Sequence, residues 1–453
     1  MLPFAAVLAC SPAPDRPGWV AAPVPDLVLA RHLVPTGFTG PAEAECVADG
    51  DPLERHLVST EHTERGPIEL YGLLADTDYT CVITTSSTED TLTFRTGSPP
   101  ADLPHWTVTG AGGWGDYTIF NHGTDEQGNR NPAILIVDRE GRLRWYFDVP
   151  FDAADLDVSY LGDGTILYGG GYGAPPSIVD LEGDTQLRVT AQAVYHHHAE
   201  RLPSGEFLVL VLADNTDGIQ TWQGMEVRIL DPSMTSTVWS WNTQRGVDEG
   251  WLNVPSQPGD PYHINSAQVT DDAVFVNFRQ KSLIARLDRQ TGDLVWLLGA
   301  NGDFTLVDET GAPDDVANWF YGAHAPEHDG NRILLHDNGY TRPGGPWSRA
   351  AEFEIDEEAG TARLTWQYTE EGWYEPIWGD VDRLPDGHVL YTRAHCGTCR
   401  PEDLSTTQIV EVDPSDQSVV WRLVLADVHD AGYRAQRIEG CALFGNTRYC
   451  PAP

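Results

Sequence analysis

Histidines in three short motifs are the residues of this chain with the clearest chemical potential. They occur in the runs YHHH, YHIN and GAHAPEH, which contain His196, His198, His263 and His324. A neutral imidazole is a nucleophile near neutral pH and a protonated one is an acid, so histidines suit a group transfer in two steps. Motifs this far apart in the chain can act together only if the fold brings them to one place.

A repeated turn relates these motifs to one another. Counted back seven residues from the end of a short polar turn, His198, Asn265 and Asp380 occupy the same position in three copies. Two residues earlier, and therefore on the same face of a strand, lie His196 and His263. Titratable groups at equivalent positions of a repeat indicate a shared site, because packing alone has no reason to place them there.

The repeat itself is a unit of four short β-strands. Residues 262–299 hold four runs of alternating or β-branched residues that are separated by turns. An Asp followed seven to ten residues later by Trp, as in Asp138 and Trp145, marks the last turn in five places, and a sixth copy lacks the Trp. A single small sheet has two apolar faces and needs neighbours of its own kind. The chain is therefore predicted to be all-β with a six-bladed β-propeller, the alternative being an irregular pair of β-sandwiches.

The rest of the chain divides around this propeller. The predicted parts are a lipoprotein-type signal and tether at 1–23, a β-sandwich module at 24–97, a linker at 98–104 and the propeller at 105–453. The module contains the run LYGLLADTDYTCVITT, which resembles the tyrosine-corner strand of fibronectin type III domains, with Tyr79 at the corner.

The cysteines and the N-terminus predict an extracytoplasmic protein. MLPFAAVLAC resembles a bacterial lipoprotein signal in which Cys10 receives the lipid, although no Lys or Arg precedes the apolar run; simple secretion is the alternative. The other six cysteines are expected to form local disulfides in an oxidising compartment, in the periplasm or at the cell envelope. The predicted pairs are Cys46 with Cys81, Cys396 with Cys399, and Cys441 with Cys450.

The charge of the chain limits its partners. The formal net charge is -40, and Lys281 is the only lysine. Such a field repels nucleic acid and anionic membrane surfaces, so membrane contact is expected only through a lipid anchor. An anionic substrate would need a local cationic site. No cofactor is predicted, and the oligomeric state stays open between a monomer and a homodimer.

From about residue 105 onward the motifs resemble the bacterial arylsulfotransferase family. The segments that carry the resemblance are HINSAQV, DRQTGDLVWLLG, GAHAPEH, HDNG followed by SRAAEFEID, and YRAQRI. The resemblance implies a six-bladed propeller that moves a sulfuryl group from a phenolic sulfate ester to a phenol through a sulfated histidine, without a nucleotide sulfate donor. A non-catalytic ligand-binding or scaffold lipoprotein is the alternative.

The same resemblance assigns roles to single residues. His263 and His324 match two active-site histidines of the family, and Arg342 matches its arginine. The family nucleophile lies in the last blade, where the nearest histidine here is His395, which is therefore the predicted sulfate acceptor; His263 or His198 would serve if it is not. The residues predicted to bind substrate around them are His196, His198, Asn265 and Arg349.

A metal site is the competing interpretation of the histidines. His196, His197, His198, His263 and His324 could bind a metal in a metal-assisted hydrolase. Alternation along a strand sends His197 to the face opposite its neighbours, so the triple-histidine run is not expected to be a chelate, and no metal ligand is predicted.

Overall fold

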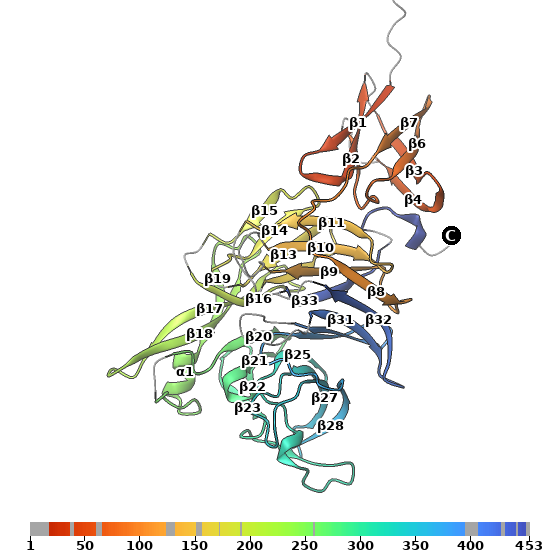
Figure 1. Ribbon diagram of the computed structural model, residues 1–453. Helices are drawn as coiled ribbons and strands as arrows, with labels where there is room; N and C mark the ends of the chain where they lie inside the picture. Colours follow the sequence, from red (N-terminus) through yellow and green to blue (C-terminus); the bar gives the residue numbers. More distant parts are fainter. Residues whose placement is uncertain are drawn as a thin grey trace, which may run out of the picture. The chain divides into compact units, whose positions relative to one another are not determined.

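Short antiparallel β-strands account for most of the regular backbone of this protein (Figure 1). The structure is a computed structural model that describes residues 18–36, 40–59, 66–123, 132–150, 156–171, 173–190, 193–256, 259–394, 406–426, 431–440 and 443–449. The chain forms two compact units, residues 1–99 with 444–453, and residues 100–443. The last ten residues therefore group with the first unit, whereas the predicted propeller range included them.

The first unit is a small β-sandwich. One sheet has the order β1-β2-β5 and the other the order β4-β3-β6-β7. The strands are β1 (Gly18–Val24), β2 (Leu27–Thr36), β3 (Ala42–Ala48), β4 (Asp51–Ser59), β5 (Ile68–Leu70), β6 (Asp78–Thr85) and β7 (Glu89–Arg95). Apolar residues of both sheets, such as Leu33 and Ala44, are buried in one shared core. Strand β1 begins inside the segment predicted as a tether.

Two details of the sandwich agree with the sequence prediction. Cys46 and Cys81 lie opposite each other in the pairing of β3 with β6 and form a disulfide, so this predicted pair is confirmed. The buried hydroxyl of Tyr79 accepts a hydrogen bond of 2.9 Å from the backbone N–H of Leu74, five residues upstream. That bond has the form of the predicted tyrosine corner. The other cysteines, Cys10, Cys396, Cys399, Cys441 and Cys450, lie outside the described residues.

The second unit contains six antiparallel sheets in its described residues. From the innermost strand outward, the first three are β33 (Ala431–Ile438), β9 (Tyr117–His122), β10 (Ala133–Asp138) and β11 (Leu143–Asp148); β12 (Asp157–Tyr160), β13 (Thr165–Gly169), β14 (Ser177–Asp180) and β15 (Thr185–Arg188); and β16 (Tyr195–Arg201), β17 (Phe207–Thr216), β18 (Thr221–Leu230) and β19 (Thr237–Asn242). The other three are β20 (Ile264–Val269), β21 (Ala273–Phe278), β22 (Leu283–Asp288) and β23 (Leu294–Leu298); β25 (His324–Asp329), β26 (Arg332–Asp337), β27 (Arg349–Asp356), β28 (Thr361–Tyr368) and β24 (Thr305–Leu306); and β29 (Asp380–Arg383), β30 (Val389–Arg393), β31 (Gln408–Asp413), β32 (Ser418–Leu425) and β8 (Trp106–Gly110).

These sheets are arranged as the blades of a propeller. Their innermost strands contact one another in a closed cycle, β33 with β12, β16, β20, β25, β29 and β33 again. Strands from both ends of the unit close the ring. Strand β8, from its start, pairs with β32, and strand β33, from its end, pairs with β9. The predicted all-β fold with a propeller and a small β-module is confirmed.

The Asp and Trp landmarks of the sequence have a structural reason. In every sheet the Asp at the end of the third strand accepts hydrogen bonds from backbone N–H groups of the following turn, which fixes the turn. The Trp on the fourth strand can then reach the next blade. Trp145 Nε1 donates to the carbonyl of Leu181, and Trp421 Nε1 donates to the carbonyl of Arg139.

Helical structure is minor. A short helix, α1 (Thr243–Asp248), lies beside the hairpin of β17 and β18 (Figure 1). In the part of the chain that the structure describes, no helix is both long enough and apolar enough to cross a membrane.

Candidate active site

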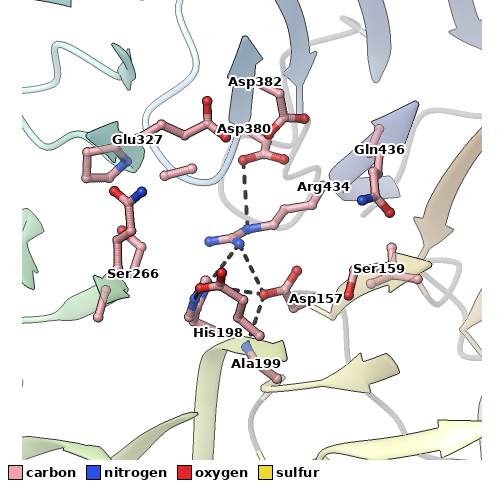
Figure 2. A pocket seen from close by; sticks show the side chains of 17 residues that line it. Asp157, Ser159, His198, Ala199, Ser266, Glu327, Asp380, Asp382, Arg434 and Gln436 are labelled. Carbon is pink, nitrogen blue, oxygen red and sulfur yellow. Dashed lines mark hydrogen bonds and ion pairs between the residues drawn. The ribbon is translucent and has the colours of Figure 1, made fainter. Parts of the chain in front are cut away.

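The wall of the propeller channel repeats one pattern on all six innermost strands. Each strand turns two residues, two positions apart, toward the channel, because side chains alternate along a strand. These pairs are Asp157 and Ser159, His198 and Glu200, Ser266 and Gln268, Ala325 and Glu327, Asp380 and Asp382, and Arg434 and Gln436. They enclose a cavity of about 240 Å³, with Arg434 in its middle (Figure 2).

The charged part of this wall is here named the channel cluster. It consists of Asp157, His198, Glu327, Asp380, Asp382 and Arg434. Nη1 of Arg434 donates to Asp157 Oδ2 at 3.1 Å and to His198 Nδ1 at 2.9 Å, and its Nε lies 3.9 Å from Asp380 Oδ1. One buried cation therefore holds three strands, β33, β12 and β16, and faces a fourth, β29 (Figure 2).

More carboxyl groups lie in the channel cluster than this cation can neutralise. Burial raises the pKa of Glu327 to about 7 and that of Asp380 to about 6, and nearby carboxylates add to both shifts. Burial and the charges of Asp380 and Glu327 raise the pKa of Asp382 well above its ordinary value. Asp157 is different: burial opposes its charge, but Arg434 and His198 hold its pKa below the ordinary value.

At the end of the channel where the inner strands begin, the backbone leaves the regular strand conformation. His197, His263 and Ala325 have φ of 57°, 48° and 43°, in the left-handed region that residues with a side chain rarely adopt. The strand pairing shifts register close to these residues, between Tyr195 and Ala199, between Ile264 and Ser266, and between His324 and Glu327. Such bulges redirect side chains and occur often beside functional sites.

The bulges gather four imidazoles, here named the histidine cluster. It consists of His196, His197, His263 and His324. The ring centroid of His197 lies 4.0 Å from that of His196, 5.1 Å from that of His263 and 6.1 Å from that of His324. The prediction that strand alternation turns His197 away from its neighbours is wrong, because the left-handed backbone at this residue interrupts the alternation.

The tautomer of His324 follows from its neighbours. Nδ2 of Asn338 donates to the carbonyls of Glu375 and Trp378, both at 2.8 Å, so the amide oxygen faces His324. That oxygen lies 2.6 Å from His324 Nδ1, which therefore carries the proton. The lone pair of His324 is consequently on Nε2, which has no hydrogen-bond partner among the described residues.

His263 is held by a carboxylate and faces a second imidazole. Its Nδ1 lies 2.5 Å from Asp260 Oδ2, and its backbone N–H donates to Asp260 Oδ1 at 2.9 Å. Its Nε2 lies 3.1 Å from Nε2 of His197, so the two rings share one proton between them. The Asp260–His263 pair resembles the carboxylate–imidazole pair of a general acid and base.

Most of the histidine cluster is kept neutral. Burial and the nearby His263 lower the pKa of His196 to about 3. Burial also lowers the pKa values of His197 and His324 well below the ordinary range, with help from neighbouring imidazoles and, for His324, from Arg279. Neutral imidazoles at neutral pH are nucleophiles and metal ligands.

The cation beside this cluster is Arg279. Its guanidinium is buried, lies 4.8 Å from the ring centroid of Tyr340 and donates from Nη2 to the carbonyl of Pro376 at 2.8 Å. Its Nε has no hydrogen-bond partner among the described residues, so the group keeps a donor for a ligand. The sequence analysis missed Arg279, although it directly follows the second strand of its blade, as Asn338 does in the next blade.

Arg342 and Arg349, the arginines predicted from the family motif, lie elsewhere in the fifth sheet. Both side chains bind Asp337 Oδ2, Arg349 at 2.8 Å and Arg342 at closer range. Arg342 Nη1 also donates to the carbonyls of Ala317 and Trp319 at 2.7 and 3.0 Å. These contacts tie Arg342, in the loop after β26, and Arg349, at the start of β27, to Asp337. No contact of either with the histidine cluster is found among the described residues.

The remaining predicted site residues lie in different parts of the structure. His196 belongs to the histidine cluster and His198 to the channel cluster. Asn265, expected beside His263, instead donates to the carbonyl of Ala323 at 2.9 Å and so supports the backbone before His324. His395, the predicted sulfate acceptor, lies outside the described residues.

Three members of the histidine cluster could hold a metal ion. One imidazole nitrogen from each of His196, His197 and His263 lies within 4.8 Å of the others. Asp386, His388 and Glu411, on the last sheet, form a second such group within the described residues. There, however, His388 Nδ1 and Arg437 already bind the Glu411 carboxylate at 2.9 and 2.6 Å.

Comparisons with known proteins point to one family. The profile described as Arylsulfotransferase (ASST) matches residues 80–434. No curated protein matches the chain. Among solved structures, a Bacteroides caccae protein of unknown function aligns over 71% of this chain and 98% of its own, with 12% identity and a TM-score of 0.47. A putative 6-phosphogluconolactonase from Bacteroides fragilis aligns over 87% and 97%, with 12% identity and a TM-score of 0.35.

Proposed function

We propose, from the premise that this chain belongs to the arylsulfotransferase family, that its histidine cluster passes a sulfuryl group from a phenolic sulfate ester to a phenol. The family match establishes arylsulfotransferase-like activity in general and bears out the resemblance of the motifs. The proposal adds a covalent intermediate on a histidine and assigns the residues.

His324 is the proposed sulfate acceptor. The observation that carries this assignment is the 2.6 Å contact of its Nδ1 with Asn338, because it leaves the lone pair on Nε2. Burial keeps the ring neutral, and a neutral imidazole attacks sulfur without first losing a proton. Asn338 itself is fixed by two backbone carbonyls, so the ring is held in one tautomer before substrate arrives.

Arg279 is the proposed partner of the sulfate oxygens. A sulfate monoester is an anion, and the chain as a whole carries a formal charge of -40, so the site needs a cation of its own. Arg279 lies close enough to His324 to lower the pKa of that imidazole, and its Nε keeps a donor. Charge-assisted N–H donors that face developing negative charge are a main source of transition-state stabilisation.

His263 is the proposed acid and base. In the first displacement the Nε2 lone pair of His324 forms the N–S bond, the S–O bond to the aryl group breaks, and its electron pair stays on the phenolic oxygen. That oxygen takes the proton shared by His263 and His197. Asp260 stabilises the imidazolium form of His263 before the transfer.

The second displacement reverses these steps with another phenol. The acceptor gives its hydroxyl proton to His263, its oxygen forms the new S–O bond, and the N–S electron pair returns to Nε2 of His324. One site therefore serves donor and acceptor in turn, which predicts ping-pong kinetics.

The proposed location of this reaction is outside the cytoplasm. The Cys46–Cys81 disulfide supports it, because such bonds persist in oxidising compartments. Lipid attachment at Cys10 is part of the same proposal. Metabolic labelling with a fatty acid, compared between the native chain and Cys10→Ser, tests the attachment.

Trapping of the intermediate tests the mechanism. Protein quenched in acid-free conditions during turnover of p-nitrophenyl sulfate is expected to carry one added sulfuryl group on the peptide with His324. Sulfate on His395, or on no histidine while transfer proceeds, would contradict the assignment. Absence of any transfer to a phenol would favour the non-catalytic binding protein instead.

A further inference from the structure

Two segments at the mouth of the channel, strand β16 and the residue before β20, present three imidazoles in a metal-ligating arrangement. Nε2 of His197 and Nε2 of His263 are 3.1 Å apart, and a nitrogen of His196 lies within 4.8 Å of both. Two ligands of one tetrahedral Zn²⁺, with bonds of about 2.0 to 2.1 Å, are about 3.3 Å apart. The observed spacing is therefore close to what one shared metal ion requires.

The outer contacts of these imidazoles are those of metal ligands. A ligating histidine almost always gives its second ring N–H to a carboxylate or a backbone carbonyl, which fixes the tautomer. Nδ1 of His263 lies 2.5 Å from Asp260 Oδ2, and Nδ1 of His196 lies 3.3 Å from the carbonyl of Ile264. In both rings the contact uses Nδ1, so Nε2 is the nitrogen that would bind a metal.

The backbone supplies an independent observation. His197 and His263 have φ of 57° and 48°. His197 lies within the register shift of β16, and His263 directly precedes β20, whose pairing shifts register between Ile264 and Ser266. A left-handed conformation at a residue with a Cβ atom is strained and persists where the surrounding structure requires it, often at functional sites. The regular strand would send the ring of His197 away from His263, so the bulge is what creates the three-nitrogen set.

We propose that His196, His197 and His263 form a site for a divalent transition metal of the Zn²⁺ class, with one coordination position open to an oxygen ligand. Three histidines with one open position are the donor set of catalytic rather than structural zinc. The side chains of His263 and Asp260 are 17% and 16% exposed, which gives the ion and the oxygen ligand a path from solvent.

If the proposed function holds, the oxygen ligand at the open coordination position is the phenolic oxygen of the substrate. A phenolic oxygen leaving sulfur carries an electron pair, and a metal ion can bind it directly where the metal-free site would supply a proton. His324 and Arg279 stay available for the sulfuryl group, because neither belongs to the three-nitrogen set. This part of the inference rests on sulfuryl transfer, whereas metal binding itself does not.

Cobalt titration tests the site without any turnover. Metal-free full-length protein titrated with Co²⁺ is expected to bind one ion with micromolar or tighter affinity and to develop the intense visible absorption of a four-coordinate Co²⁺–imidazole centre. Addition of a phenol should shift that spectrum. His196→Gln and His197→Gln should each weaken binding by more than the roughly 10–100-fold that loss of an outer partner such as Asp260→Asn causes.

Matched controls keep the result unambiguous. His328→Gln changes another partly buried histidine, whose ring stacks on Phe275 at 3.9 Å, and should leave Co²⁺ binding unchanged. His388→Gln removes the second metal-like group and should also leave it unchanged. Binding that is absent, or that is lost in His388→Gln and kept in His197→Gln, would overturn the site.

Activity assays on the same samples separate the two proposals. Reloading metal-free protein with Zn²⁺ is expected to raise sulfuryl transfer from p-nitrophenyl sulfate at least tenfold. Transfer that is full in metal-free protein would remove the metal from the reaction and leave the proposed function standing. Co²⁺ bound by the three histidines with no transfer under any condition would contradict the proposed function and leave the metal site standing.

Discussion

The histidine cluster and the channel cluster lie on the same innermost strands, yet they differ in almost every physical property. Three members of the histidine cluster, His196, His197 and His324, are buried imidazoles with lowered pKa values, so they are neutral. The channel cluster collects carboxyl groups around Arg434, and its acids either pair with that cation or have raised pKa values. The histidine cluster therefore keeps neutral imidazoles that can bind ligands, whereas the channel cluster is mainly committed to its own ion pairs.

The backbone explains the difference. Along the channel each strand alternates regularly, so residues two positions apart face the axis and meet their counterparts on neighbouring strands. At the mouth, left-handed backbone at His197 and His263 and register shifts in β16 and β20 interrupt this alternation, and His196, His197 and His263 come together. Regular strands thus form the ion-paired channel cluster, and interrupted strands form the histidine cluster.

The largest expected effect separates the two clusters by activity. His324→Asn removes the proposed sulfate acceptor and should lower kcat for transfer from p-nitrophenyl sulfate by at least about 10⁴-fold. The thermal midpoint should change little by comparison, and His328→Gln should retain most of the native rate. A His324→Asn protein with more than a tenth of native kcat would show that the acceptor lies elsewhere.

The next effect is one of stability and concerns the channel cluster. Arg434→Met leaves Asp157 buried without its cation, and breaking a buried ion pair from one side destabilises a protein by about 3–5 kcal/mol. Urea unfolding followed by tryptophan fluorescence should show the loss. Arg279→Met, at the histidine cluster, should change the unfolding free energy far less, since Arg279 makes no ion pair among the described residues. Equal unfolding free energies of Arg434→Met and Arg279→Met would contradict this difference between the channel cluster and the histidine cluster.

A third comparison sets two arginines against each other. Arg279→Met should reduce kcat/KM for an aryl sulfate by about 10²-fold, because a buried donor to the sulfate oxygens is lost. Arg342→Met removes a partner of buried Asp337 and should act on stability, leaving transfer per folded molecule within about threefold of native. Steady-state kinetics on samples matched for folded fraction decide the matter. Abolished transfer in folded Arg342→Met protein would restore the arginine that the family motif indicated.

Sequence patterns were sufficient for the architecture because each element repeats. The Asp-to-Trp landmark could be found from one copy to the next, since the Asp fixes a turn by local hydrogen bonds and the Trp reaches the neighbouring blade. The Cys46–Cys81 pair and the Tyr79 corner are equally local, and both are present in the structure. Local chemistry that recurs or spans few residues can be predicted without coordinates.

The site could be predicted only in part, because its residues depend on where alternation fails. His198 and Asp380 do share the channel face, but the register shift between Ile264 and Ser266 moves the fourth sheet by one residue, so Ser266 faces the channel and Asn265 does not. The same kind of bulge brought His197 into the cluster against expectation. Left-handed φ at a histidine has no sequence signal comparable to an Asn-Gly turn, so this part needed the structure.

The polar partners of the histidines could not be predicted from the sequence for a related reason. Asp260 and Asn338 fix the tautomers of His263 and His324, and each is three or fourteen positions away from its histidine in the chain. Asn338 stood in the HDNG motif, so its presence could have been noted, but its contact with an imidazole of another strand could not. Arg342 was the arginine that the motif indicated, and Arg279 was missed, because the sequence did not show that Arg342 is paired with Asp337.

The smallest expected effect concerns the pH dependence of the channel cluster. Burial raises the folded-state pKa of Glu327 from 4.5 to about 7, so the folded protein binds a proton there that the unfolded chain releases. The stability this group supports is therefore complete below about pH 4.5 and is lost as pH rises through about 7. Glu327→Gln resembles the protonated form, and it should stabilise the protein at pH 8 by on the order of 2 kcal/mol while changing little at pH 5. The urea midpoint at the two pH values measures this, with Glu358→Gln on an exposed turn of the same sheet as control. A variant that loses stability at pH 8 would show instead that the Glu327 carboxylate is a paired charge like that of Asp157, which would contradict its raised pKa.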